Sequence, residues 1–413
     1  MSTEVVLILV SLVIIVSYVL DILSSKTRVP PIIFLVLSGL ALRVVSNRAG
    51  IHIPYVAPLL STLGAVGLIL IVLDAGLDLD LNQEKLPLLR NSLLAAVTSL
   101  GLTLAAITGF FLMAFGGDLR TCLINAIPFS IISSAIAIPG ARHIGAQERE
   151  FVTYESSFSD ILGILVFNLV LFNTSYGLGT FFSFGFEIFA TVIASILFSL
   201  GLTVLIEKIN HRIKYLPIFS VLLLAYAVSK LLHFSPLILV LIFGLMLNNF
   251  HLIIRGNLRL HLDAARLRQE VDSFNSVISE STFVVKIFFF LLLGYSVSMG
   301  TLLNIQLALV ALPVLFLVYV FRYPALYLFS RPGLRQLLPI APRGLITILL
   351  FMSIPADLRM AGIGDGLMVW MILGTSAVMT FGVLLTGKGS IEPEGGLAAE
   401  PGRSGPADTG ASV

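Results

Sequence analysis

Long apolar stretches separated by short polar segments follow one another along almost the whole chain. A transmembrane helix needs about 20 consecutive, mostly apolar residues, and about thirteen stretches approach or exceed that length. They cover residues 3–23, 30–46, 57–77, 91–115, 121–140, 152–173, 182–206, 216–232, 234–250, 282–300, 302–328, 337–355 and 363–387. The pattern predicts an all-α polytopic membrane protein with about 13 transmembrane helices.

Composition strengthens this prediction. Of the 413 residues, 57% are hydrophobic and 12% are charged, whereas soluble domains carry about 25% charged residues. Membrane lipid is therefore the expected surrounding, and the small net charge of +2 gives no sign of a nucleic-acid partner. The single cysteine, Cys122, excludes a disulfide framework and a thiolate metal cluster.

Basic residues in the connecting segments define an orientation. The segments after odd-numbered stretches hold fifteen lysine and arginine residues, and those after even-numbered stretches hold three. Positively charged loops stay in the cytosol, which predicts an external N-terminus and a cytosolic C-terminus. The first stretch carries Glu4 and lacks a basic start, so we expect a mature helix there and not a cleaved signal.

Two of the predicted spans are interrupted. In the fifth span, Ser133 and Pro139 lie in a run of small residues, and in the twelfth, Pro342, Arg343 and Gly344 follow one another. Proline removes a helical N–H and glycine loosens the turn, so each helix can break at membrane depth. The breaks are seven spans apart. Because this number is odd, the second half of the chain would cross the membrane in the opposite direction to the first half. Paired interrupted helices predict inverted repeats and a transport site.

Asp160 is the most unusual residue of the predicted spans. The sixth span begins with polar residues, and Asp160 lies about six residues, roughly 9 Å, inside it. A carboxylate at membrane depth costs roughly 2.5–3.5 kcal/mol on insertion scales and normally marks an ion or proton path. The alternative is that Asp160 only bonds to a neighbouring helix.

Helical spacing separates Asp160 from Glu155. Ser156 and Asp160 are four residues apart and share a face, whereas Glu155 lies about 140° around the helix from Asp160. Glu155 therefore needs another partner. Arg322 lies about six residues from the cytosolic end of the eleventh span, at a similar depth. We expect a Glu155–Arg322 ion pair that supports the helix and does not bind the ion.

Other polar segments are expected at the membrane surface. Lys286 and Asp74 fall near cytosolic helix ends, where snorkelling toward water is the simpler account. Residues 250–280 predict an amphipathic helix on the cytosolic surface. Residues 388–413 are rich in small residues and proline, which predicts a disordered cytosolic tail.

Enzyme motifs are incomplete in this chain. Gly362 to Asp365 match the Gly-x-Gly-Asp of intramembrane aspartyl proteases, but no aspartate follows a tyrosine to supply the second carboxylate. No His-Glu-x-x-His zinc motif occurs. We expect neither an enzyme nor a cofactor.

Several motifs in order resemble those of the monovalent cation/proton antiporter superfamily, sodium/proton exchanger type. Tyr154 to Asp160 resemble its Glu-Ser-x-x-Asn-Asp motif. Other signatures that it resembles lie in residues 64–80, 223–248, 288–294 and 342–344. The resemblance covers nearly all of residues 1–387, which we expect to form one transmembrane antiporter domain.

The resemblance implies two sub-domains and a homodimer. A dimer-forming part would comprise residues of about 1–80 and 216–300, and a mobile core about 91–173 and 302–387, with a linker helix of about 182–206. Helices five and twelve would cross beside Asp160, which would bind the proton or the monovalent metal ion. Ser156, Ser159 and the broken backbone near Ser134 would contribute to that site.

Two departures from the family pattern affect the expected substrate. Ser159 stands where the family has asparagine, or aspartate in its electrogenic members. Ser133-Ser134-Ala135 is similar to the Ser-Ser-Thr of a potassium-exchanging branch. Sodium is the expected cation, with potassium and lithium left open.

The expected function is exchange of a monovalent cation for H⁺ across the cell (inner) membrane in pH homeostasis. Because serine cannot carry a second charge, we expect electroneutral, one-for-one exchange by alternating access. Two alternatives remain: a sodium-coupled organic-anion symporter of similar fold, and a channel or sensor that exchanges no ions.

Overall fold

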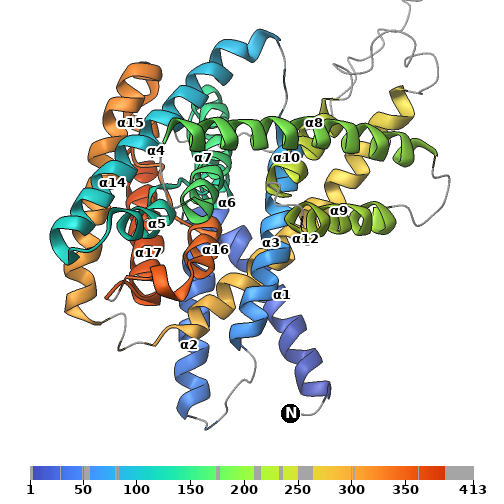
Figure 1. Ribbon diagram of the computed structural model, residues 1–413. Coiled ribbons are helices and arrows are strands. Elements are labelled where there is room, and N and C mark those ends of the chain that lie inside the picture. The colour runs from blue at the N-terminus through green and yellow to red at the C-terminus, as the bar shows by residue number, and fades with distance from the viewer. Residues whose placement is uncertain are drawn as a thin grey trace, which may run out of the picture.

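The computed structural model describes residues 3–27, 29–48, 50, 56–79, 81, 83–173, 177–208, 215–231, 236–249, 264–298, 300, 303–360 and 362–386. These residues form helices and their connections, and contain no strand (Figure 1). This all-helical architecture is the predicted one.

The longer helices follow the predicted spans closely. They are α1 (Thr3–Thr27), α2 (Pro31–Arg48), α3 (Val56–Asp78), α4 (Leu86–Phe115), α5 (Leu119–Ser130), α6 (Ser134–Gly140), α7 (Ala146–Phe172), α8 (Leu178–Lys208), α9 (Tyr215–Leu231), α10 (Pro236–Asn248), α12 (Ala264–Ser296), α14 (Ile305–Phe329), α15 (Leu334–Leu337), α16 (Leu345–Ser353) and α17 (Asp365–Thr386). Short 3₁₀ turns are η1 (Gln83–Lys85), η2 (Ala141–His143), η4 (Arg331–Gly333) and η5 (Ala356–Leu358). Within the described ranges, 9 helical segments are long and apolar enough to cross a membrane. The number of thirteen spans stays a prediction.

The helices pack in two groups. The first contains α2, α3, α10 and α12, with α8 and α9 against α10. The second contains α4, α5, α6, α7, α14, α15 and α17, and α16 contacts both α5 of this group and α3 of the first. In Figure 1 most of the second group lies on the left, α9 and α10 lie to its right, and α8 runs across the view toward the right.

Glycine pairs bring the helices of the first group into backbone contact. A Cβ atom on Gly39 of α2 would lie 2.1 Å from a carbonyl oxygen of α12, next to Gly294. A Cβ atom on Gly76 of α3 would lie 2.8 Å from a carbonyl oxygen of α10, next to Gly244. Small residues allow this approach. The contact of α2 with α12 joins the second predicted span to the tenth, and the contact of α3 with α10 joins the third to the ninth. A shift of seven spans takes the second span to the ninth and the third to the tenth. The two contacts are therefore equivalent, as inverted repeats require.

The predicted amphipathic helix at residues 250–280 is helical over the part that the structure describes, but it is not a separate element. Residues 264–280 continue into the tenth span as one helix, α12. Val271, Phe274 and Ile278 are buried in protein, and the ring of Phe274 packs against Tyr215 and Phe243. Apolar spacing identifies a buried face but does not tell whether lipid or protein covers it. Residues 250–263 lie outside the described residues.

Both interrupted spans break, and the breaks meet. Between α5 and α6 the backbone is extended at Ile131 and Ser133, and between α15 and α16 it leaves the helix before Gly344. The backbone N–H of Ser133 donates a hydrogen bond to the carbonyl oxygen of Pro342 at 2.9 Å. A Cβ atom on Gly344 would lie 2.6 Å from the hydroxyl oxygen of Ser133. The crossing therefore requires glycine at 344.

The first break lies earlier than the proline predicts. Pro139 is in the last turn of α6, and the non-helical residues are 131–133. A proline late in a short helix loses only one helical N–H partner. The interruption is instead stabilised by bonds from Ile132 and Ser133 to other segments.

Candidate ion-binding site

Asp160 lies on α7 beside the start of α6. Its Oδ2 atom accepts hydrogen bonds from the backbone N–H of Ser134 at 3.1 Å and from the Ser134 hydroxyl at 2.6 Å. The side chain is 4% exposed. Its second oxygen, Oδ1, is buried and has no hydrogen-bond partner among the described groups. A buried polar atom without a partner is costly, so Oδ1 is available for a proton or a cation.

Two buried hydroxyl groups, one on the first break and one on α7, also lack a hydrogen-bond partner among the described groups. The Oγ atoms of Ser133 and Ser157 are buried without a hydrogen bond within the described part of the protein. Ser133 belongs to the first break. Ser157 precedes Asp160 by three residues, so Ser157 and Asp160 lie on the same side of α7. Ser157 was not among the predicted ligands, although its spacing from Asp160 could have identified it.

The two predicted serine ligands on α7 use their hydroxyl groups differently. The Ser156 hydroxyl donates to the carbonyl oxygen of Val152 in its own helix at 2.7 Å, so only its lone pairs are left for an ion. The Ser159 hydroxyl oxygen accepts the backbone N–H of Ile132 at 2.9 Å. Ser159 therefore contacts the first break directly. Their roles as ion ligands stay predictions.

Glu155 and Arg322 form a bidentate ion pair between α7 and α14. Both oxygens of Glu155 accept guanidinium hydrogen bonds of 2.8 Å, and each side chain is 1% exposed. Arg322 also donates to the carbonyl oxygen of Leu337 at the end of α15, at 3.3 Å. The pair thus links the helix that carries Asp160 to the second broken helix, and both Glu155 oxygens are occupied.

Arg343 connects the second break to the first. Its guanidinium donates to the carbonyl oxygens of Phe129 and Ser130 at the end of α5, at 2.6 and 3.4 Å, and to that of Ala341 at 3.0 Å. Its backbone N–H donates to the hydroxyl of Thr375 at 2.9 Å. These bonds satisfy carbonyl groups that the break leaves without helical partners. Thr375 was not predicted, because a threonine within an apolar helix carries no distinguishing signal.

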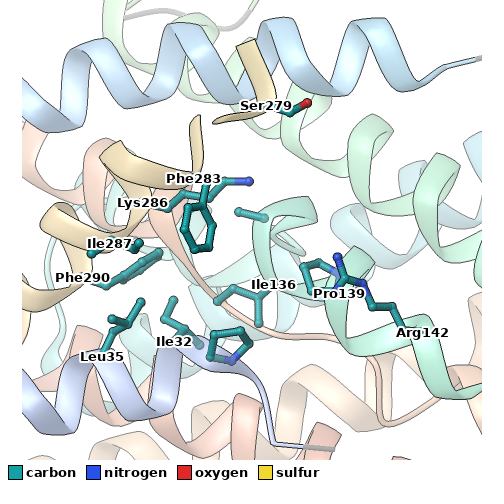
Figure 2. Close-up of a pocket in the computed structure, with 12 residues that line it drawn as sticks. Ile32, Leu35, Ile136, Pro139, Arg142, Ser279, Phe283, Lys286, Ile287 and Phe290 are labelled. Carbon is teal, nitrogen blue, oxygen red and sulfur yellow. The ribbon is translucent and has the colours of Figure 1, made fainter. Parts of the chain in front are cut away.

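Lys286 and Asp74 are not simply turned toward water, as snorkelling would require. The Lys286 amino group lies 3.9 Å from a carboxylate oxygen of Asp74 on α3. Lys286 also lines a cavity of about 210 Å³ between α12, α2 and α6 (Figure 2). The other polar side chains of its lining are Ser279 and Arg142.

The chemistry of the site suits a proton or a monovalent cation. No cluster of three histidine, cysteine, aspartate or glutamate residues that could hold a metal ion occurs in the described part of the chain. One carboxylate with a free oxygen, next to neutral hydroxyl groups, remains. Such hard oxygen ligands suit alkali cations and do not form a transition-metal site.

The sequence matches a model of the transmembrane sodium/hydrogen exchanger family over residues 9–388. The chain belongs to the sodium/hydrogen exchanger family. No curated protein matches it. Two structures of the sodium proton antiporter MjNhaP1 from Methanocaldococcus jannaschii, one of them at pH 8, share its fold. They superpose with TM-scores of 0.68 and 0.66 at 19% and 18% sequence identity, over 93% of this chain and 96% of theirs.

Membership of the family makes this chain an integral membrane transporter and supports cation/proton antiport. The matched residues include both broken helices and α7. The fold similarity at this level of identity concerns the arrangement of helices and not the choice of ion.

Proposed function

We propose that the protein exchanges one monovalent cation, Na⁺ in the first place, for one H⁺, and that both ions compete for Asp160. The observation that carries this proposal is the free Oδ1 atom of a buried carboxylate beside two crossing breaks. A buried anion is costly unless it is paired. Proton and cation each remove that cost, and binding of one excludes the other.

The surrounding residues would position Asp160. Ser134 fixes one carboxylate oxygen with two donors, so the other oxygen keeps a defined direction. Ser133, Ser156 and the broken backbone near Ser134 would add neutral oxygen ligands for a cation, whereas Ser159 would hold the first break through Ile132. Glu155 and Arg322 would support α7 without taking part in ion binding.

Alternating access would move the group of helices that contains α4 to α7, α14 and α17 relative to the first group. The first group would form a homodimer, with residues of about 1–80 and 216–300 in it, and the second would be the mobile core. We place the protein in the cell (inner) membrane with its N-terminus outside, because the basic loops then lie in the cytosol.

A proteoliposome assay tests the proposal. Addition of Na⁺, Li⁺ or K⁺ should release protons from vesicles that contain the wild-type protein, as measured with a pH-sensitive dye. Asp160→Asn should abolish this release while the protein still inserts. Asp118→Asn, which changes an exposed acid at the start of α5, is the matched control and should retain it.

The outcomes separate the candidate functions. Cation-coupled proton release that persists in Asp160→Asn would overturn the role of Asp160. A wild-type response that requires an organic anion would favour symport, and cation flux without proton movement would favour a channel. Both results would contradict exchange.

A further inference from the structure

The cavity beside α6 presents positive charge in a protein that carries cations. Lys286 and Arg142 are the charged residues of its lining, and no carboxylate lines it. The lining includes Ala135 and Ile136, which follow Ser134, the residue that holds Asp160. In Figure 2 the amino group of Lys286 points away from α12, toward the side that Ile136 and Arg142 occupy. The cavity therefore places a fixed cation close to the candidate ion site.

Lys286 is paired, but loosely. Its amino group is 3.9 Å from Asp74, which is beyond hydrogen-bond distance. The other carboxylate oxygen of Asp74 accepts the Ser279 hydroxyl at 2.6 Å. Asp74 therefore offsets the positive charge of Lys286 only in part, and Arg142 adds a second positive charge to the cavity lining.

We propose that Lys286 and Asp74 together set the cation affinity of Asp160 from the cavity side. The inference rests on the proposed function, in which Asp160 is the ion site. Lys286 repels a cation at Asp160 and so promotes release into the cavity, and Asp74 limits that repulsion. Both residues are positioning residues, because they act on the ion through the electric field and do not contact it.

The location of the pair makes its effect depend on conformation. Asp74 and Lys286 lie on α3 and α12, in the first group of helices, whereas Asp160 lies on α7 in the second. A movement of the second group would change the separation between Lys286 and Asp160, but not that between Lys286 and Asp74. The repulsion would then act while the site faces the cavity and weaken once the site moves away.

The test is the Michaelis constant for Na⁺ in proteoliposomes with one protein orientation, measured separately from each face. Lys286→Met should lower KM on the cavity side about threefold to tenfold, since unit charges interact more strongly inside a protein than in water. Asp74→Asn should raise KM on that side. The double variant should have an intermediate KM, and Lys286→Arg should stay near wild type because it keeps the charge. Ser276→Ala, an exposed position on α12, is the control and should change nothing.

A merely structural role of the pair predicts something different. Loss of a stabilising contact would lower the thermal stability and the maximal rate in both single variants, with KM changed in the same direction or not at all. KM shifts of opposite sign that appear on one face only would support the proposal. An unchanged KM in Lys286→Met together with an unchanged KM in Asp74→Asn, or equal shifts on both faces, would overturn it. Failure of the proposed function shows separately, as exchange that survives Asp160→Asn.

Discussion

The two broken helices cross at their breaks but have opposite charged partners. Both breaks lie at one crossing, where Ser133 of the first bonds to Pro342 of the second. The first break faces a carboxylate, Asp160, at the N-terminal end of α6. The second break involves two arginines: Arg343 lies within it, and Arg322 of α14 donates to the carbonyl oxygen of Leu337 at the end of α15. At the N-terminal end of α16, the backbone N–H of Gly344 donates to a neutral group, the Thr347 hydroxyl.

This difference shows how one crossing can serve a single ion. The arginines satisfy carbonyl groups that the breaks expose, so these carbonyl ends need no bound cation. Asp160 has only neutral donors from Ser134, so its charge is not cancelled in place. Glu155, five residues earlier on the same helix, is fully neutralised by Arg322. Inverted repeats therefore provide the scaffold twice, and side chains create the binding function once.

The largest expected effect is at Arg343. Arg343→Leu removes the donors to Phe129 and Ser130, and leaves buried carbonyl groups unsatisfied. Hydrogen bonds to charged groups contribute about 1.5–3 kcal/mol each, so we expect loss of folded protein, measured as yield and as unfolding temperature in detergent. Arg343→Lys keeps the charge but not the fork of donors and should be intermediate. A stable Arg343→Leu protein would show that the breaks hold without this arginine.

The next effect concerns the ion pair that links the two regions. Glu155→Ala should destabilise the protein by about 3–5 kcal/mol, because a buried arginine loses its partner. The double variant Glu155→Ala with Arg322→Ala should be less destabilised than the sum of the single changes. Thermal unfolding of the four proteins measures this coupling. Strict additivity would contradict a support role for the pair.

A smaller effect is expected at Ser159, and it shows whether this residue stabilises the broken backbone or binds the ion. Ser159→Ala leaves the N–H of Ile132 without its acceptor, at a cost of about 1–3 kcal/mol. We therefore expect a lower unfolding temperature and a KM for Na⁺ that changes less than about twofold. A twofold change in KM corresponds to less free energy than the roughly 1 kcal/mol of one hydrogen bond. Ser159→Asn supplies an amide oxygen and should recover stability. A large rise in KM at unchanged stability would instead make Ser159 an ion ligand.

Much of this arrangement could be predicted from sequence, for physical reasons. Proline and glycine at membrane depth mark the second break, and a carboxylate six residues inside a span identifies Asp160. Equal depth on two spans was sufficient to pair Glu155 with Arg322. Each of these inferences depends on one helix or on distance from the membrane surface, which the order of residues contains.

The remaining features depend on which helices pack together. The first break falls at residues 131–133, and not at Pro139, because distant segments satisfy its N–H groups. The carbonyl partners of Arg343 lie on another broken helix. The contact of Lys286 with Asp74 follows from the packing of α12 against α3. No local pattern encodes these contacts.

The smallest expected effect is that of membrane voltage on exchange. Near the first break, Asp160 is the one carboxylate with a free oxygen in the described structure; Glu155 is occupied by Arg322, and the second break contributes arginines, which keep their charge. Asp160 then carries the same charge with H⁺ as with a monovalent cation, so exchange moves no net charge. If one net charge crossed per exchange cycle, a potential of 100 mV would change the free energy of exchange by about 2.3 kcal/mol. The sodium-to-proton gradient ratio at equilibrium would then shift roughly 50-fold. We therefore expect a potassium–valinomycin potential to leave sodium-driven proton flux nearly unchanged, with the sodium gradient balanced by pH alone. A balance point that moves with voltage would show that a second group, such as Lys286 at the cavity, carries a proton together with Asp160.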